Sequence, residues 1–388
     1  INMSDDLSKY IGNAEEFPVL SHWDFFNHAG ASPLPRVVAD AMRKYVAETE
    51  TTAYLTGNRY GELDVIRAIA AKMVNADADE IALLKNTAEG LSIVAHAIDW
   101  QPGDRIVTAA GEYPANVYPW MEQSRRGAEL IFVPETVGAD GARQVPLDAI
   151  LREAAHPRTR VVTLSHVEFG TGQRHDLAAI GAFCREHGKI FVIDAIQSLG
   201  ALPVDVKAMS IDYLATGGQK WMLASEGAGF FFCRRELLER TRPLVIGAIS
   251  VANALDFSNY DYTLAPTGRR FESGTYNIAG FRALRAAMEL LMAAGEQNVS
   301  ARIKLLTDRL IAGVRRKGYS IASPRTGEQW SGIVSFASPT HDHESIARTL
   351  RKEHKTELMV RGGRLRAAPH FYNTEEQIDR LIERLPSH

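Results

Sequence analysis

One lysine in this sequence follows a strand-like run and a pair of glycines. Lys220 lies in the stretch "YLATGGQKWM", directly before a tryptophan. Reactive groups of α/β proteins gather at the carboxyl ends of strands, where loops converge. We expect the glycines to let the backbone turn tightly and a ligand come close. A lysine there can attack a carbonyl as an amine nucleophile and form a Schiff base, although most lysines are solvated surface residues.

A carboxylate closes another apolar run of the sequence. Asp194 ends the strand-like part of "IFVIDAIQSLG", so a strand would leave its side chain half buried. Burying a carboxylate costs free energy unless a cation or a strong hydrogen-bond donor pairs with it. A protonated pyridine nitrogen would be such a donor. A strand-end aspartate that caps the next helix is the simpler alternative.

A third stretch has the features of an anion-binding turn. In "KNTAEGLSIVAHAI" a strand gives way to a helix at Thr87, Ala88 and Glu89. Free N–H groups and the helix dipole favour a phosphate at such a helix start. The stretch matches neither the Walker signature nor the dinucleotide fingerprint, and a plain capped helix has the same pattern.

Together these positions describe a pocket for pyridoxal 5′-phosphate (PLP), whose phosphate, ring nitrogen and aldehyde match the turn, the aspartate and the lysine. A lysine-dependent aldolase without PLP would leave the phosphate site unexplained. Metal catalysis has little support, because only His341 and His343 in "THDHES" lie close together. We expect them to be solvated loop residues.

The elements that must position these groups alternate between strand and helix over residues 65–235. Most apolar runs are continuous, as expected for strands covered on both faces, and stretches such as "DLAAIGAFCREHG" have helical spacing. The alternation predicts an α/β fold, a three-layer αβα sandwich around a mainly parallel, seven-stranded sheet. The runs are "EIALLKN", "RIVTAAGEYP", "LIFVP", "RVVTLSHV", "IFVIDAIQS", "DYLATGG" and "GAGFFFCRR".

The pattern changes towards the C-terminus. A long helical stretch over residues 281–318 leads to strands in "GIVSFAS" and "LRAAPHF", and Thr374 is a suitable N-cap for a final helix. We therefore expect a large PLP-binding domain over residues 26–262 and a smaller α+β domain over residues 263–388. Residues 1–25 are expected to pack on the smaller domain.

These motifs resemble the class V aminotransferase family of fold-type I PLP enzymes, which includes cysteine desulfurases, C–S lyases, kynureninase and isopenicillin N epimerase-like proteins. The resemblance runs from "FFNHAGASPLP" through "HVEFGTGQRHDL", "DAIQ", "GGQKW" and "RRFESGTYN" to "LRAAPHFYNTEEQID". It implies a fold-type I PLP transferase, a Schiff base between Lys220 and the cofactor, and a quinonoid carbanion as the shared first intermediate. Lys220, freed by the substrate, would then move the Cα proton.

The resemblance also implies roles for single residues around the ring and the substrate. Asp194 would keep the pyridinium protonated, and Gln197 would donate to the ring hydroxyl. Tyr113 in "GEYPANVYPW" would stack on the ring. Arg366 would hold the substrate carboxylate with its guanidinium fork, and Asn27 would also contact the substrate.

The remaining implied roles concern the phosphate. Thr87 and Ala88 would form its binding turn. Gln219 replaces a histidine that some relatives have, and its amide can still hydrogen-bond a phosphate although it cannot act as an acid. Thr275 in "ESGTYN" would reach the phosphate from a partner subunit, which implies a homodimer with shared active sites.

One departure from the resemblance bears on the reaction. Desulfurases carry a nucleophilic cysteine shortly before the carboxylate-binding arginine, whereas the cysteines here are Cys184 and Cys233, expected to be small core residues. We therefore expect a C–S or other carbon–heteroatom lyase acting on a small amino acid. A class V aminotransferase is the main alternative, and epimerisation or kynureninase-like cleavage also remain open. A cofactor-free binding module that keeps the fold is a further class.

Composition limits the partners. With a net charge of −3, 45% hydrophobic and 23% charged residues, the chain has the composition of a globular protein and no basic field for nucleic acid. No apolar run is long enough to span a membrane, so we expect no membrane contact. The cysteines form no disulfide framework or metal motif, which predicts a cytoplasmic location.

Overall fold

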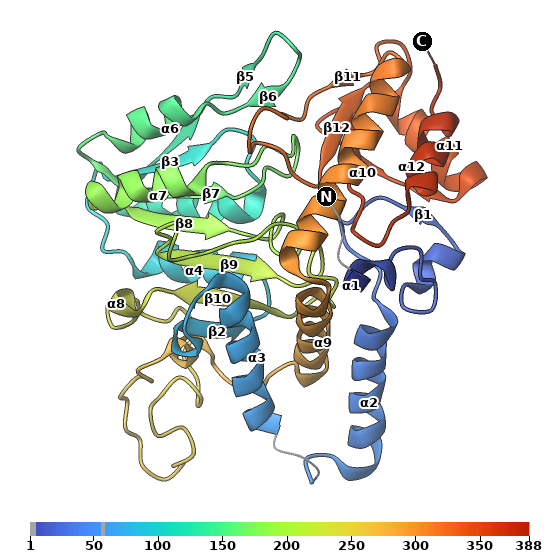
Figure 1. Cartoon of the computed structure of the whole chain (residues 1–388). Helices are drawn as coiled ribbons and strands as arrows, with labels where there is room; N and C mark the ends of the chain where they lie inside the picture. Colours follow the sequence, from blue (N-terminus) through green and yellow to red (C-terminus); the bar gives the residue numbers. More distant parts are fainter. Residues whose placement is uncertain (1–4, 56–58, 388) are drawn as a thin grey trace.

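A seven-stranded sheet forms the body of the molecule in the computed structural model, which describes residues 5–55 and 59–387 (Figure 1). The strand order is β2-β10-β9-β8-β7-β3-β4, and every pairing is parallel except the two made by β10. Each strand lies in one of the predicted runs, apart from the first residue of β4 and of β7, so the predicted sheet is confirmed. The strands are β2 (Ile81–Leu84), β3 (Arg105–Ala109), β4 (Glu129–Val133), β7 (Thr159–Ser165), β8 (Ile190–Asp194), β9 (Tyr213–Gly217) and β10 (Gly229–Cys233).

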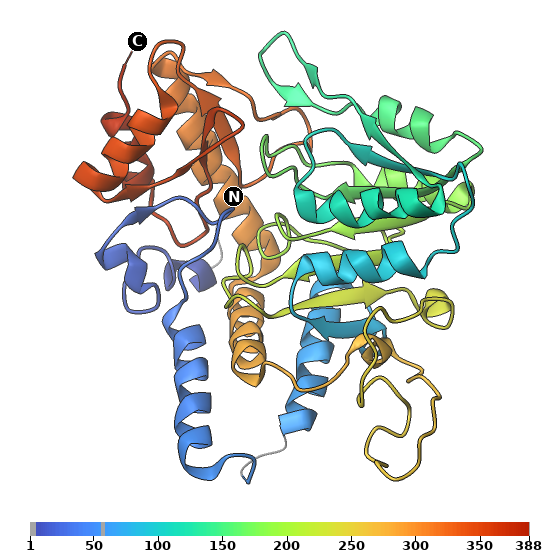
Figure 2. The ribbon, with the colours of Figure 1, turned by 180° about the vertical axis from the view of Figure 1, so that it is seen from behind.

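Helices cover both faces of this sheet, which makes the predicted three-layer sandwich correct. Val161 and Val162 of β7 belong to different buried clusters, because successive side chains of a strand point to opposite faces. Helices α4 and α5 lie on one face and α3, α6, α7 and α9 on the other (Figures 1 and 2). Burial on both faces explains why the runs are continuously apolar. These helices are α3 (Arg59–Val74), α4 (Thr87–Ala97), α5 (Tyr118–Met121), α6 (Leu147–Ala154), α7 (Leu177–Glu186) and α9 (Ile278–Ala294).

A second, antiparallel sheet of order β11-β12-β15-β14 forms in the C-terminal part of the chain. Its strands β12 and β15 lie in the predicted runs. Thr374 caps the final helix as predicted, since its hydroxyl accepts a hydrogen bond from the Gln377 N–H at 3.3 Å. The elements are β11 (Ser320–Ile321), β12 (Val334–Ala337), β14 (Met359–Arg361), β15 (Arg364–Ala367), α10 (Glu296–Arg316), α11 (His343–His354) and α12 (Glu375–Arg384).

The long helical stretch over residues 281–318 is two helices rather than one. Helices α9 and α10 are separated by Gly295, whose φ of 81° lies in the left-handed region that glycine adopts without strain. Helix α9 packs on the central sheet, whereas most of α10 packs on the second sheet (Figure 1). Gly295 therefore marks the point where the chain passes from one sheet to the other.

The N-terminal segment packs on the C-terminal part of the chain. Strand β1 (Asp24–Phe25) pairs in parallel with β13 (Thr356–Glu357). The buried ring of Phe17 stacks on Tyr372 with ring centroids 4.0 Å apart. The division of the chain at residue 262 stays a prediction. The other elements are α1 (Asp5–Ser8), α2 (Arg36–Thr52), β5 (Thr136–Val137), β6 (Arg143–Gln144) and α8 (Arg235–Leu238).

None of the described helices has the length and apolar character that a membrane crossing requires. The sheets and their covering helices bury their apolar side chains against each other, in clusters on the two faces of the central sheet and on the second sheet. The packing of the N-terminal segment on the C-terminal part of the chain can be tested at the contact between Phe17 and Tyr372.

Replacing Phe17 by alanine is expected to lower the free energy of unfolding by about 3–5 kcal/mol, because the change leaves a cavity beside Tyr372. Chemical denaturation at one fixed protein concentration measures the change. Val137→Ala is the control, because Val137 is exposed on β5 and should change stability by less than about 0.5 kcal/mol. Equal effects of the two substitutions would contradict the packing of the N-terminal segment.

Candidate active site

The predicted residues converge at one edge of the central sheet. Because only β10 runs against its neighbours, the carboxyl ends of the other strands face the same way. A cavity of about 260 Å³ opens at this edge. Its wall is formed by Ala29, Gly30, Asn86, Thr87, Ala88, Tyr113, Ala115, Phe169, Ile196, Gln197, Gln219, Lys220, Glu226, Arg361 and Arg366.

Seven of the ten predicted site residues line this cavity, and three do not. Asp194 is buried just behind the wall that its neighbour Ile196 forms. Asn27 also stands behind the wall, where its Oδ1 accepts a hydrogen bond from Arg366 Nη2 at 3.4 Å. Thr275 is exposed and lies outside the cavity of its own chain. The lining residues are Thr87, Ala88, Tyr113, Gln197, Gln219, Lys220 and Arg366.

Lys220 combines burial with a nearby aromatic ring. Its Nζ lies 5.2 Å from the ring centroid of Tyr113. Burial lowers the pKa of Lys220 to about 8, Asp194 opposes the shift, and Arg366 and Arg361 add to it. A growing share of the side chain is therefore free amine as the pH rises towards 8, the form that a nucleophile or base requires.

The two glycines before Lys220 provide space, and the chain bends at Gly218 directly after β9, as expected. Neither Gly217 nor Gly218 is among the glycines with positive φ. A Cβ atom on Gly218 would lie 2.8 Å from the Cβ of Ala224. The turn follows the lysine, where Leu223 has a φ of 61° and its N–H donates to the Lys220 carbonyl at 3.0 Å.

Asp194 presents a carboxylate oxygen without a protein partner. Its Oδ1 accepts the Ile196 N–H at 2.9 Å, whereas Oδ2 is buried with no hydrogen bond within the described chain. Burial raises the pKa of Asp194 to about 6, and the Ile196 N–H and Lys220 limit the rise. Near pH 7 the group is mostly ionised, so an incoming donor such as a pyridinium N–H would relieve a real cost.

The start of helix α4 leaves donors free for an anion. The side chain of Asn86 caps the helix by accepting the Glu89 N–H at 2.9 Å. The N–H groups of Thr87 and Ala88 come before the first turn is complete, so they have no partner inside the helix. The buried Thr87 hydroxyl also lacks a partner in the described structure. Gln219 lines the same cavity, and the arrangement suits a phosphate.

A chain of hydrogen bonds fixes the floor of the cavity. The Gln197 amide donates from Nε2 to the Ala29 carbonyl at 3.0 Å and accepts from Trp221 Nε1 at 3.0 Å. Trp221 is fully buried, and its carbonyl accepts a hydrogen bond from His370 Nε2 at 2.9 Å. The tryptophan therefore anchors the chain directly after Lys220. One N–H of the Gln197 amide is left for a ligand.

Arg366 supplies a cation at the opposite end of the cavity. Its Nη1 donates to the Phe169 carbonyl at 2.9 Å, and Nε is buried without a partner. Burial, with repulsion from Arg361, lowers the pKa of Arg366 to about 10, so it stays charged near neutral pH. The ring of Phe169 meets Tyr113 edge to face at 5.2 Å. Sequence reasoning missed Phe169, although it lies in the quoted "HVEFGTGQRHDL", and Arg361, which lies just before the quoted C-terminal stretch.

Two buried carboxyl groups behind the cavity were also missed. Glu112 accepts hydrogen bonds from the Ser165 backbone and hydroxyl, and Glu168 Oε1 contacts His175 Nε2 at 2.9 Å. Burial, with repulsion from Asp194, raises the pKa of Glu168 to about 8. Burial, with repulsion from Glu168, raises the pKa of Glu112 well above its usual range. Near neutral pH, Asp194 is therefore the ionised member of the three.

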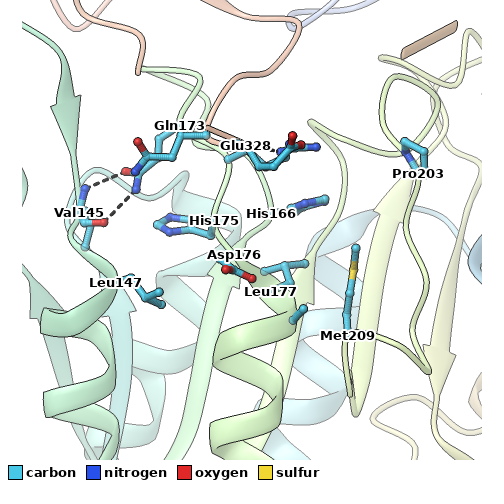
Figure 3. A pocket seen from close by; sticks show the side chains of 13 residues that line it. Val145, Leu147, His166, Gln173, His175, Asp176, Leu177, Pro203, Met209 and Glu328 are labelled. Carbon is cyan, nitrogen blue, oxygen red and sulfur yellow. Dashed lines mark hydrogen bonds and ion pairs between the residues drawn. The ribbon is translucent and has the colours of Figure 1, made fainter. Parts of the chain in front are cut away.

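A larger cavity of about 420 Å³ is lined in part by residues 173–178, and it lacks the groups that PLP binding requires (Figure 3). Burial lowers the pKa of its histidines, to about 3 for His166 and about 4 for His175, so both are neutral. Its arginine, Arg174, is paired with Glu328. No lysine lines this cavity, and we assign the active site to the smaller one.

Metal-ligating side chains do not gather in groups of three or more anywhere in residues 5–55 and 59–387. The expectation of a solvated loop histidine is wrong for His343, which begins helix α11. Its Nε2 accepts the Ser338 N–H at 2.9 Å, and its Nδ1 contacts the Gly363 carbonyl at 2.7 Å. These contacts give it a structural role.

Comparison with protein families decides the affiliation of the chain. The profile of the aminotransferase class-V family matches residues 24–381. The chain belongs to the class V aminotransferase family. It is 31% identical to a probable cysteine desulfurase of Methanothermobacter thermautotrophicus, over 95% of this chain and 96% of that protein. It is 26% identical to the uncharacterized aminotransferase YcbU of Bacillus subtilis, over 95% of both chains.

Solved structures agree with this family and with the fold-type I architecture. The apo cysteine desulfurase of Thermococcus onnurineus superposes with a TM-score of 0.85 at 26% identity, over 99% of this chain and 97% of that one. The cystine C–S lyase C-DES, in complex with cysteine persulfide, superposes with a TM-score of 0.84 at 27% identity, over 95% of this chain and 98% of the other.

Membership in this family makes the chain a PLP-dependent enzyme, and its cavity fits that cofactor. Three buried polar atoms at the cavity have no partner in the described structure: Thr87 Oγ1, Asp194 Oδ2 and Arg366 Nε. They offer a donor to a phosphate, an acceptor to a ring N–H and a cation to a carboxylate. Lys220 lies on the wall of the same cavity. The roles of the individual residues stay predictions.

In the cofactor-free protein, Asp194→Asn is expected to raise stability near pH 7.5 by about 1–3 kcal/mol, because it removes an unsatisfied buried charge. The folded pKa of about 6 exceeds the usual 3.8, so the folded state binds more protons than the unfolded state between these values. Stability of the natural sequence should fall as the pH rises through this window, and the variant should lack that fall.

Urea denaturation of both cofactor-free proteins, at about pH 4.5 and about pH 7.5, measures the difference. Asp148→Asn is the control, because Asp148 is exposed on helix α6. A variant that loses stability at the higher pH would show that the carboxylate is satisfied within the protein.

Proposed function

We propose that this enzyme breaks a C–S or other carbon–heteroatom bond at Cβ of a small amino acid. The proposal rests on where the cysteines lie. Cys184 in α7 and Cys233 in β10 are buried in the core, and neither lines the cavity. Burial raises the pKa of each thiol to about 12, so neither is a thiolate near neutral pH. A leaving group must therefore depart with its own electron pair rather than pass sulfur to a cysteine of the cavity.

The residues of the chain divide the chemistry of the first step. When bound, PLP supplies an electron sink for the pair left at the substrate Cα. Arg366 holds the α-carboxylate with two parallel N–H donors. Lys220 Nζ accepts the Cα proton, a task suited to an amine with a pKa near the working pH. Asp194 would keep a proton on the ring nitrogen, because its Oδ2 has no other partner in the described structure and could accept that N–H.

The second step separates Cβ from its heteroatom. The electron pair of that bond leaves with the heteroatom, and the proton held on Lys220 Nζ is available to it. The remaining product is 2-aminoacrylate, which water converts to pyruvate and ammonium. Tyr113 and Phe169 stand in edge-to-face contact at the cavity wall, where Lys220 is itself buried.

Transamination is the alternative, and the relative named an uncharacterized aminotransferase supports it. In that reaction the bound cofactor would supply the acceptor of the amino group, and a 2-oxo acid would leave. The same Lys220 would move the proton, so the wall of the cavity serves either outcome. The products distinguish the two reactions.

Purified holoenzyme is expected to release pyruvate from L-cystine, L-cysteine or O-acetyl-L-serine without accumulating pyridoxamine phosphate. Lys220→Ala should reduce pyruvate release by about 10²–10⁴-fold or more and abolish the visible absorbance of the lysine-bound cofactor, because the base and the amine are lost together. Lys207→Ala is the control, because Lys207 is an exposed lysine away from the cavity.

Conversion of the cofactor to pyridoxamine phosphate, with recovery only on addition of a 2-oxo acid, would make the lyase proposal wrong and support the aminotransferase. Unchanged absorbance in Lys220→Ala would remove the lysine from both reactions.

We also propose that the active enzyme is a homodimer with shared sites. The segment over residues 239–267, which projects from the sheet in Figure 1, exposes 80% of Leu255, 72% of Phe257 and 98% of Tyr260. Clustered apolar side chains this exposed are typical of a protein contact. Thr275 follows this segment and is exposed too, so in a dimer it would reach the phosphate bound by the other chain.

The double variant Phe257→Asp, Tyr260→Asp is expected to sediment as a monomer and to retain PLP more weakly than the natural sequence. Two charges in an apolar contact oppose association, and the phosphate then lacks Thr275. Analytical ultracentrifugation and cofactor absorbance measure both effects, with Val137→Asp as an exposed control. A natural sequence that sediments as a monomer would contradict the proposal.

A further inference from the structure

Arg361 is a second arginine on the wall of the active-site cavity. It ends strand β14, which pairs with the strand that carries Arg366. The connecting turn consists of Gly362 and Gly363, with φ values of 55° and 71°, and it places Arg361 opposite Arg364 in the register. A two-residue turn of this kind fixes the pairing of its strands. The position of Arg361 is therefore set by the hairpin.

Neither cavity arginine is neutralised by a carboxylate of the described chain. Arg361 donates from Nη1 to the Val360 carbonyl at 3.0 Å, and Arg366 has only a carbonyl and an amide as partners. Arg302, a comparably buried arginine of α10, is instead paired with Glu375 at 2.6 Å. A guanidinium with only neutral partners has no counter-ion, so binding of an anion beside it is favoured.

The positive charge is concentrated at one end of the cavity. Arg361 lowers the pKa of Arg366, and both arginines lower the pKa of Lys220. Glu226 is the acidic residue of the cavity wall, and it forms no ion pair with either arginine. Its side chain is exposed, and it lies shortly before β10, whose first residue pairs with the end of β2. That pairing places Glu226 at the phosphate end.

None of the polar groups of PLP or of a plain amino acid is assigned to Arg361. The start of α4 at Thr87 takes the phosphate, Asp194 takes the ring nitrogen, and Arg366 takes the α-carboxylate. These assignments rest on the function proposed above. The part of the substrate still without a partner is its side chain.

We infer that Arg361 binds an anionic group on the substrate side chain, and that the substrates are short amino acids whose Cβ carries a sulfur or phosphorus oxyanion. The cavity of about 260 Å³ must also hold the cofactor, which limits the substrate to a short side chain. S-sulfo-L-cysteine and O-phospho-L-serine have this chemistry. A guanidinium suits both groups, because its parallel N–H donors match two oxygen atoms.

The elimination balances without a thiol. Lys220 Nζ takes the Cα proton, and the Cβ–S or Cβ–O bond breaks with its electron pair leaving as thiosulfate or phosphate. The 2-aminoacrylate that remains reacts with water to give pyruvate and ammonium. An arginine beside the leaving group stabilises the charge that develops on it. The burial of Cys184 and Cys233 is therefore no obstacle to this reaction.

Kinetics of the holoenzyme test the inference. Arg361→Gln is expected to lower kcat/KM for pyruvate release from S-sulfo-L-cysteine or O-phospho-L-serine at least about tenfold, because one ion pair is lost. The value for uncharged O-acetyl-L-serine should change less than about twofold. Arg364→Gln is the matched control, since this arginine faces Arg361 in the hairpin but does not line the cavity. The released anion, thiosulfate or phosphate, identifies which of the two oxyanions the site accepts.

A natural sequence with no preference for the charged substrates would overturn the inference. So would a variant that lowers turnover of all substrates equally. Pyruvate release from O-acetyl-L-serine would keep the proposed lyase in either case.

Calorimetry provides a readout without turnover. L-Cysteate carries a sulfonate that cannot leave, and L-2-aminobutyrate is an uncharged analogue of similar length. The holoenzyme is expected to bind L-cysteate at least about tenfold more tightly, and Arg361→Gln should lose this advantage. Equal affinities in the natural sequence would contradict the role of Arg361. If no substrate yields pyruvate, the lyase proposal fails and this binding difference still decides the inference.

Discussion

A buried amine and a buried carboxylate of opposite charge are held close to each other at the carboxyl edge of the central sheet. Asp194 ends β8, and Lys220 follows β9, the parallel strand beside it. Burial disfavours the charged form of both groups, and each stabilises the charge of the other. The pair persists because the sheet beneath it is covered on both faces. The site is thus maintained at the expense of local stability, as is common where function requires unsatisfied groups.

The second sheet is tied to the same strand end by a hydrogen bond of Trp221. The carbonyl of Trp221, next to Lys220, accepts a hydrogen bond from His370, and the indole N–H donates one to Gln197. His370 follows β15 within the chain, so this hydrogen bond ties the strand of Arg366 to the strand end that carries the lysine. The bulky tryptophan after the lysine is therefore a connection between the two sheets. Through it, Arg361 and Arg366 are held at a cavity whose other walls belong to the central sheet and its loops.

Local patterns predicted the strands because both faces of the sheet are buried. Such strands are continuous apolar runs, which stand out in the sequence. They also located Lys220 and Asp194, since chemistry in parallel sheets follows the strand ends. They failed where tertiary packing decides. Gly218 is needed because a Cβ atom there would meet Ala224, a contact that no local pattern reveals. Arg361 reaches the cavity only through the pairing of β14 with β15.

In the roles proposed above, the distribution of charge around the cavity separates the cofactor from the substrate. The proposed phosphate end offers helix N–H groups, the Thr87 hydroxyl and the Gln219 amide as neutral donors, and its carboxylate, Glu226, is exposed. Both arginines stand at the other end, on one hairpin of the second sheet. Because Arg361 and Arg366 have only carbonyl and amide partners in the described chain, their charge is available to an amino acid that enters. Substitutions in that hairpin would therefore change substrate preference without disturbing the strands that hold the cofactor, which is how one fold serves several reactions.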